Sequence, residues 1–131
     1  MLNFFFLIIL LFSSLHSKDF KGFGASLDIL DRQTTKQYLF TIPIGQSINI
    51  GLDQFVVYQC LSFDNEEIYD EYALIHIFEQ NEKDSEAKNI FLGWIIKSSP
   101  SLVVIEHPTY EIRLNQCIEE DPLYPEIQSL N

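Results

Sequence analysis

Short segments in which apolar and polar side chains alternate with a period of two constrain this chain most strongly. Turn residues such as Pro43 and Gly45 separate these segments, and no long helical period is found. The expected strands are residues 25–30, 37–42, 47–52, 55–61, 72–78, 89–96 and 110–117. The pattern predicts an all-β domain of about seven antiparallel strands, arranged as a compact sandwich or a small barrel.

Two of these segments, residues 72–78 and 89–96, have apolar side chains on both faces. In the second, Leu92 and Trp94 alternate with Ile95 and other apolar residues. A strand with two apolar faces is covered on both sides. The second face therefore predicts either another layer of the domain or contact with another molecule.

The segment between the last two expected strands contains signals for a short helix. Ser99 can cap a helix whose first residue is Pro100, and Pro108 prevents its continuation. We therefore expect one short helical turn near residues 100–105, which would cover part of an apolar face.

The N-terminus resembles a secretory signal peptide. Residues 4–12 are uninterrupted apolar residues, and the first charged side chain is Lys18. This run is too short for a membrane span, which needs about 20 residues, but it suits a signal peptide cleaved after Ser17. An uncleaved N-terminal anchor is the alternative. We expect a periplasmic protein with no direct membrane insertion after cleavage.

The domain division that follows has three parts. Residues 1–17 are the signal peptide, residues 18–117 a single β domain, and residues 118–131 an acidic tail expected to be extended or flexible. The formal net charge is −11, and none of it comes from the signal peptide. Such a charge repels phosphate backbones and so argues against nucleic acid as a partner. A basic protein or a cation is the expected partner.

The two cysteines, Cys60 and Cys117, are expected to form one disulfide, because the chain is predicted to be exported. Two buried free thiols are an alternative. A metal pair is a further one, but only His76 and His107 could assist it and no short Cys-x-x-Cys spacing is present.

A Ser-His-acid hydrolase is the catalytic alternative. Its candidates would be Ser98, Ser99, Ser101, Glu106 and His107, but neither a G-x-S-x-G elbow nor an S-x-x-K motif is present. The simpler interpretation makes Ser99 a helix cap and His107 a turn residue bonded to backbone. We therefore predict no catalytic residues.

No cofactor or metal is expected either. Phosphate-binding, dinucleotide-binding and haem-attachment motifs are missing from the sequence. The acidic residues within 62–71 lack the spacing of an EF-hand and are interpreted as a solvated loop. His76 is expected to be a half-buried imidazole with satisfied hydrogen bonds.

Several short motifs resemble an exported alphaproteobacterial family catalogued as domain of unknown function number 2155. Its C-terminal signature is similar to Gly93-Trp94, Ser98-Ser99-Pro100, Glu106-His107-Pro108, Tyr110 and Cys117, and the N-terminal half is similar at Leu30-Asp31, Phe40, Ile42-Pro43-Ile44-Gly45 and Cys60. Ser101 and Glu111 replace the family's usual Ala and Asp. The resemblance implies export, paired cysteines and a β-rich domain. Family genes often neighbour one for an accessory subunit of the proton-pumping NADH dehydrogenase, which suggests a respiratory membrane complex as a partner.

The sequence thus predicts a non-catalytic periplasmic interaction module, an accessory or assembly factor for an envelope protein or membrane complex. The candidate interaction surface consists of Trp94, Ser99, Pro100, Leu102, Glu106, His107 and Tyr110. The same residues could instead close the core. The alternative functions are a small periplasmic hydrolase using a Ser/His pair and a small-ligand carrier.

Overall fold

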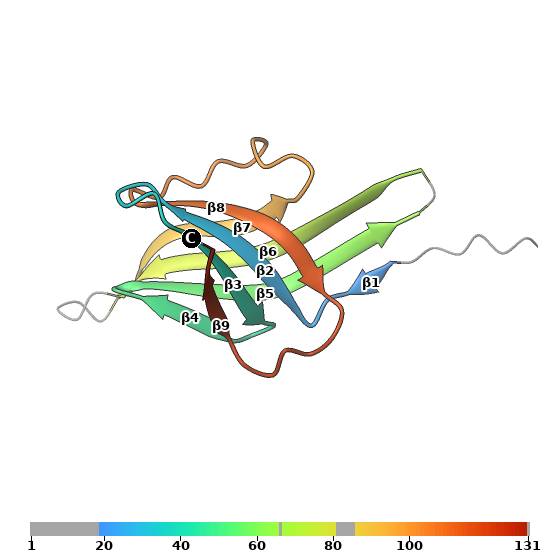
Figure 1. Ribbon diagram of the computed structural model, residues 1–131, viewed down its shortest axis with the longest axis horizontal. Coiled ribbons are helices and arrows are strands. Elements are labelled where there is room, and N and C mark those ends of the chain that lie inside the picture. The colour runs from blue at the N-terminus through green and yellow to red at the C-terminus, as the bar shows by residue number, and fades with distance from the viewer. Residues whose placement is uncertain (1–18, 66, 81–85, 131) are drawn as a thin grey trace, which may run out of the picture.

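The computed structural model describes residues 19–65, 67–80 and 86–130, in which the chain forms nine β-strands and no helix (Figure 1). The expected signal peptide, residues 1–17, lies outside the described residues. The strands are β1 (Phe20–Lys21), β2 (Gly24–Asp31), β3 (Gln37–Pro43), β4 (Ser47–Ile50), β5 (Asp53–Asp64), β6 (Tyr69–Glu79), β7 (Lys88–Ile96), β8 (Tyr110–Ile118) and β9 (Glu126–Ser129).

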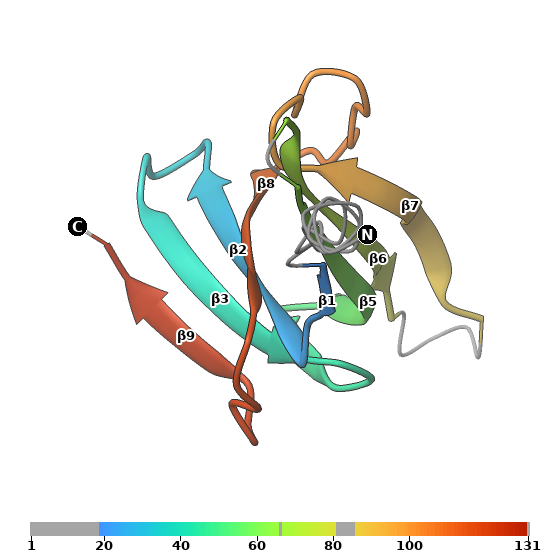
Figure 2. The same cartoon turned by 90° about the vertical axis from the view of Figure 1, so that its right-hand side faces the viewer.

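The strands form two antiparallel sheets that face each other. One sheet has the order β1–β5–β6–β7, with β4 also paired to β5, and the other has the order β8–β2–β3–β9. Figure 2 shows β5, β6 and β7 in one layer and β2, β3 and β9 in the other. Within the described residues the two sheets do not close on each other. Of the two predicted architectures, the structure therefore has the sandwich and not the barrel.

The hydrophobic core lies between the two sheets. Leu27 and Phe40 from one sheet and Phe55 and Ile75 from the other are at most 1% exposed. The rings of Phe40 and Phe55 meet edge to face, with centroids 5.5 Å apart. Each fully buried side chain of this kind contributes roughly 1.5–3 kcal/mol. The contact between the sheets is therefore the main source of stability.

The strands predicted from alternation are confirmed, with ends that differ by at most three residues. The period-two alternation locates these strands because an antiparallel strand of a sandwich buries one face only. Strands β1 and β9 were not predicted. With two and four residues, they are too short to produce a recognisable period.

The predicted helical turn near residues 100–105 forms only in part, and no helix is present there. Only a single turn forms there, in which the N–H of Leu102 donates to the carbonyl of Ser99 at 3.1 Å. Beyond it, half-buried Val103 and Ile105 pack against the core, and exposed Val104 lies between them. This is the alternation of an extended chain. β-branched side chains favour such a conformation, and here they overrule the capping signal.

The tail is also more ordered than predicted. Residues Glu126–Ser129 form β9, which pairs with β3 and places Ile127 opposite Phe40. All four of its side chains are exposed, so backbone pairing rather than side-chain burial holds it in place. A strand of this kind leaves no hydrophobic signal in the sequence.

Candidate interaction site

An apolar outer face covers the side of the β5–β6–β7 sheet that points away from the core. In β6, Ala73, Ile75 and Ile77 point inward and are at most 1% exposed, whereas Leu74 and Phe78 point outward and are half-buried. The outer face is defined here by the exposed and half-buried apolar side chains on the outward side of the three strands: Tyr58, Leu61, Phe63, Tyr72, Leu74, Phe78, Leu92, Trp94 and Ile96.

Strand pairing arranges these side chains in rows. Leu74 lies opposite Trp94, and Tyr72 lies between Leu61 and Ile96. Leu92 is 56% exposed and Trp94 is 39% exposed, although both are large apolar residues. Asp70, in the outward series of β6 opposite Phe63, places one carboxylate at the end of this face, whereas the positions around Leu74, Leu92 and Trp94 carry no Asp, Glu, Lys or Arg. A contiguous apolar surface without charges is typical of a contact site.

His76 forms a polar bridge within the outer face. Its Nε2–H donates to Oδ1 of Asn89 at 2.9 Å, and its Nδ1 accepts from the hydroxyl of Tyr58 at 3.2 Å. The ring also lies 4.8 Å from that of Phe78. Both ring nitrogens are satisfied, as the sequence predicts for this half-buried imidazole. The bridge joins β5, β6 and β7.

The surface predicted from the sequence comes from β7, from the connection between β7 and β8, and from the start of β8. Trp94 is on β7 and belongs to the outer face. Pro100, Leu102 and Glu106 are exposed in the connection from β7 to β8, and Ser99 is half-buried there. Figure 1 shows this connection, in orange, as a long arch beyond the end of β7. Only Trp94 of these residues lies on the sheet.

The other two predicted surface residues, His107 and Tyr110, face inward. His107 is only 4% exposed: its Nε2–H donates to Oδ2 of Asp53 at 2.9 Å, and its Nδ1 accepts from the N–H groups of Thr109 and Tyr110 at 3.0 and 3.1 Å. Nη1 of Arg32 donates to the His107 carbonyl at 2.9 Å. These bonds fix the neutral tautomer with the proton on Nε2. His107 therefore fastens the connection to β5 and offers little surface to a partner.

One serine of the catalytic alternative, Ser98, bonds to a carboxylate and not to this imidazole. The Ser98 hydroxyl donates to Oδ2 of Asp70 at 2.5 Å, and its N–H donates to Oδ1 at 3.1 Å. Both nitrogens of His107 are already engaged, so this imidazole is not available as a base for a serine. The arrangement of Ser98 and Asp70 joins β6 to the end of β7.

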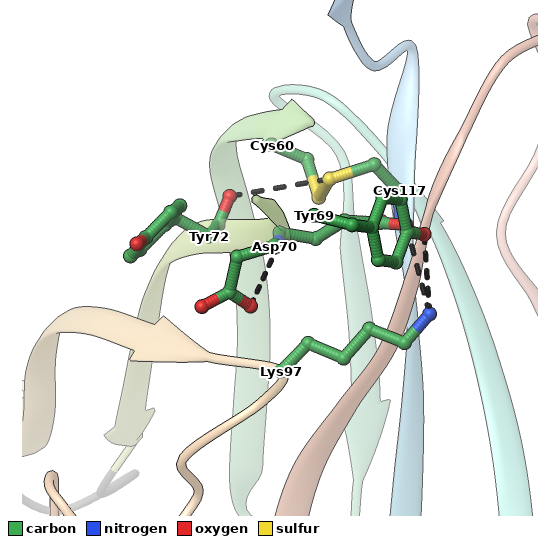
Figure 3. Close-up of a disulfide and its surroundings, with 7 residues drawn as sticks. Cys60, Tyr69, Asp70, Tyr72, Lys97 and Cys117 are labelled. Atoms are coloured by element: carbon green, nitrogen blue, oxygen red, sulfur yellow. Dashed lines mark hydrogen bonds and ion pairs between the residues drawn. A yellow bond between two sulfur atoms is a disulfide. The ribbon is translucent and has the colours of Figure 1, made fainter. Parts of the chain in front are cut away.

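A second buried polar cluster surrounds Glu71, which is 3% exposed. Its carboxylate accepts hydrogen bonds from the hydroxyl of Tyr69 and the N–H of Cys117, and Nζ of Lys97 lies 3.6 Å away. Figure 3 shows Lys97 extending toward Tyr69 beside the disulfide of Cys60 and Cys117. The hydrogen bond to Glu71, aided by burial, raises the pKa of the Tyr69 phenol.

This cluster ties the two sheets together at one end. Cys60 lies on β5 and Cys117 on β8, so the predicted disulfide is present and crosses between the sheets. Glu71 was interpreted from the sequence as part of a solvated acidic loop. Strand β6 instead starts at Tyr69, which puts Glu71 in the inward series with Ala73. Extending the alternation by one step toward the N-terminus would have found it.

The part of the chain that matches known proteins spans most of the folded domain. Residues 25–117 match the family described as "Uncharacterized protein conserved in bacteria", domain of unknown function 2155. The chain belongs to this family. It is also 27% identical over 105 residues to an uncharacterized protein of Rickettsia prowazekii (strain Madrid E), an alignment that covers 79% of this chain and 67% of the relative. No solved structure matches the chain.

The part shared with this family of unknown function runs from β2 to the end of β8. It includes the outer face, both cysteines, Glu71 and His107, and it excludes β1 and β9. The family description names no activity. In the described part of this family member, no helix is long and apolar enough to cross a membrane, and no group of His, Cys, Asp and Glu side chains could hold a metal ion.

Proposed function

We propose that this protein is an exported, non-catalytic interaction module that binds an envelope protein or membrane complex through the outer face. The uncharged, apolar surface around Leu92 and Trp94 carries this proposal. Soluble domains rarely expose such a surface unless something covers it. A docking partner supplies the second layer that the two-faced strands β6 and β7 require.

The disulfide supports export to an oxidising compartment. Cys60 and Cys117 are bonded, and bonds of this type persist in the periplasm but are rare in the cytosol. Periplasmic extraction followed by intact-mass measurement tests this point. We expect a chain that starts at Lys18 and lacks two hydrogen atoms relative to its reduced form. A full-length reduced chain in the cytosol would contradict export.

The polar clusters support a structural rather than catalytic role for the buried acids and bases. His107 is held by Asp53 and two backbone N–H groups, and Glu71 is held by Tyr69 and Cys117. In each cluster the titratable group joins two segments of chain. This is the role expected of buried groups that maintain a binding surface.

The partner is expected to carry basic residues next to its apolar contact. The formal charge of −11 favours association with positively charged proteins and disfavours nucleic acid. A partner that combines an apolar patch with Lys or Arg would match both the outer face and the overall charge. Its association rate should fall as ionic strength rises.

Co-purification with matched variants tests the proposed function. Tagged protein is recovered from solubilised envelope, and the accompanying proteins are identified by mass spectrometry. Leu92→Glu places a charge in the outer face, whereas Leu102→Glu places it on the connection, where the side chain is 72% exposed. We expect Leu92→Glu to lose a stoichiometric partner that Leu102→Glu retains. Equal retention by folded forms of both variants would contradict docking through the outer face.

A further inference from the structure

Strand β7 forms an open edge of its sheet. It pairs with β6 on one side, and among the described residues no strand pairs with its other side. Figure 2 shows β7 as the last strand of its layer. The backbone N–H and C=O groups along an open edge have no sheet partner and can pair with another polypeptide.

The register shows which groups face this edge. The N–H of Lys97 donates to the carbonyl of Glu71 at 3.0 Å, so this opposed pair is hydrogen-bonded. Hydrogen-bonded and non-hydrogen-bonded pairs alternate along an antiparallel ladder. The backbone groups of Leu92, Trp94 and Ile96 therefore point to the open edge. The side chains of the same three residues belong to the outer face.

The β7 edge has a lysine and a bulge only at its start, at Lys88 and Ile90, and lacks protection against strand addition beyond them. From Ile90 to Ile96 it contains no charged residue and no proline. The edges of the other sheet differ: Pro125 and Glu126 stand at the start of β9, and exposed Arg113 lies in β8. Natural proteins block exposed edges with charges, prolines or short strands. The unprotected edge and the apolar face thus coincide at β7.

We propose that an extended segment of a partner protein, rich in apolar residues and flanked by Lys or Arg, adds as a strand to the open edge of β7. This inference rests on the proposed function and specifies how the partner binds. Backbone pairing holds the segment at Leu92, Trp94 and Ile96, and its alternate apolar side chains extend the outer face. Charge selects this occupant over a second copy, because two chains with a formal charge of −11 repel each other.

A synthetic peptide tests the proposal without knowledge of the natural partner. In the probe, Val and Thr alternate between terminal lysines, and its matched control carries N-methyl groups on alternate residues. Amide hydrogen exchange is measured by NMR with and without peptide. We expect exchange at Leu92, Trp94 and Ile96 to slow about tenfold or more, while Gly93 and Ile95, which face β6, change little. The N-methylated peptide should give no such protection.

A pair of variants at one position separates backbone pairing from side-chain contact. Leu92→Ala keeps the edge N–H, whereas Leu92→Pro removes it without breaking a bond to β6. We expect Leu92→Pro to bind the peptide about five- to tenfold more weakly than Leu92→Ala, the effect of one lost backbone hydrogen bond. Thermal unfolding checks that both variants fold, and the exchange experiment on the unmodified chain needs neither variant.

Three outcomes would overturn the inference. The first is failure of the lysine-flanked peptide to bind, and the second is binding without slower exchange at the three edge amides. In the second case, weaker peptide binding by the Trp94→Ala variant would show that the outer face still docks a ligand, so the proposed function survives. The third is protection of the edge amides in the free protein together with dimerisation in sedimentation experiments, which would assign the edge to a second copy.

Discussion

The buried carboxylate of Glu71 accepts a hydrogen bond from the backbone N–H of Cys117, and so joins β6 of one sheet to β8 of the other. The disulfide of Cys117 with Cys60 lies beside this contact. Covalent and polar links therefore meet at the same end of the sandwich. Lys97 adds its ammonium group to the cluster from the end of β7.

Replacement of Glu71 should destabilise the domain. In Glu71→Ala the N–H of Cys117 loses its acceptor in a buried site, which costs about 1–3 kcal/mol of the free energy of unfolding. Urea unfolding measures this loss. Glu67→Ala, in the exposed turn between β5 and β6, is the control and should change little. Equal stability of the two variants would contradict a structural role for Glu71.

Removal of the disulfide should cost more than any single hydrogen bond. Cys60 and Cys117 are separated by 57 residues, and a loop of that length restricts the unfolded chain by about 4 kcal/mol. The double variant Cys60→Ser, Cys117→Ser is compared with the oxidised protein in urea. A reduced wild-type sample should behave like the double variant. Identical midpoints for oxidised and reduced protein would show that the bond adds no stability.

His107 should be replaceable by a residue that accepts the same backbone bonds. In His107→Ala the N–H groups of Thr109 and Tyr110 lose their acceptor, and we expect the free energy of unfolding to fall by about 2–4 kcal/mol. His107→Asn can accept from both groups through Oδ1, so it should recover part of the loss. If His107→Asn were no more stable than His107→Ala, the backbone hydrogen bonds to Nδ1 would not be the contacts that stabilise this site.

The two faces of the β5–β6–β7 sheet should respond differently to truncation. Ile75→Ala removes an inward side chain that is 1% exposed and should cost about 2–5 kcal/mol. Leu92→Ala on the outer face should cost no more than about 0.5 kcal/mol in the isolated protein. Thermal and urea unfolding provide both values. A large loss for Leu92→Ala would mean that the outer face is part of the core.

Stability at acid pH should depend on the contact between Ser98 and Asp70. Burial raises the pKa of Asp70, but hydrogen bonds from Ser98 and from the N–H of Glu71 lower it more, so that the net shift is downward. A carboxyl group whose pKa is lower in the folded state stabilises the fold above its unfolded pKa. That contribution disappears as the pH falls through the folded value.

Comparison with Ser98→Ala measures this contribution. The urea midpoint of Ser98→Ala should lie below that of the wild type near neutral pH, and the two should converge as the pH falls below 3.8, the ordinary pKa of the group. Ser101→Ala, an exposed residue in the same connection, should show no pH-dependent difference. A constant gap between wild type and Ser98→Ala across the pH range would exclude Asp70 as the cause.

The candidate interaction site could be predicted in part. The two apolar faces of residues 72–78 and 89–96 predicted either a further layer of the domain or a contact face, and in the structure Trp94 is 39% exposed. The same reading placed His107 on the surface. Its burial depends on Asp53, which lies 54 positions earlier in the chain and is brought to it by the fold. Such long-range pairing has no local sequence signal.

The sequence by itself determined where the main strands lie, because alternation with a period of two reports directly on a strand with one buried face. It also determined the all-β class and the pairing of the two cysteines. Only the tertiary structure decided that Glu71 is buried and that β7 is left as an open edge. Strand order and sheet contact bring distant segments together, and local pattern carries no information about which strand is last in its sheet.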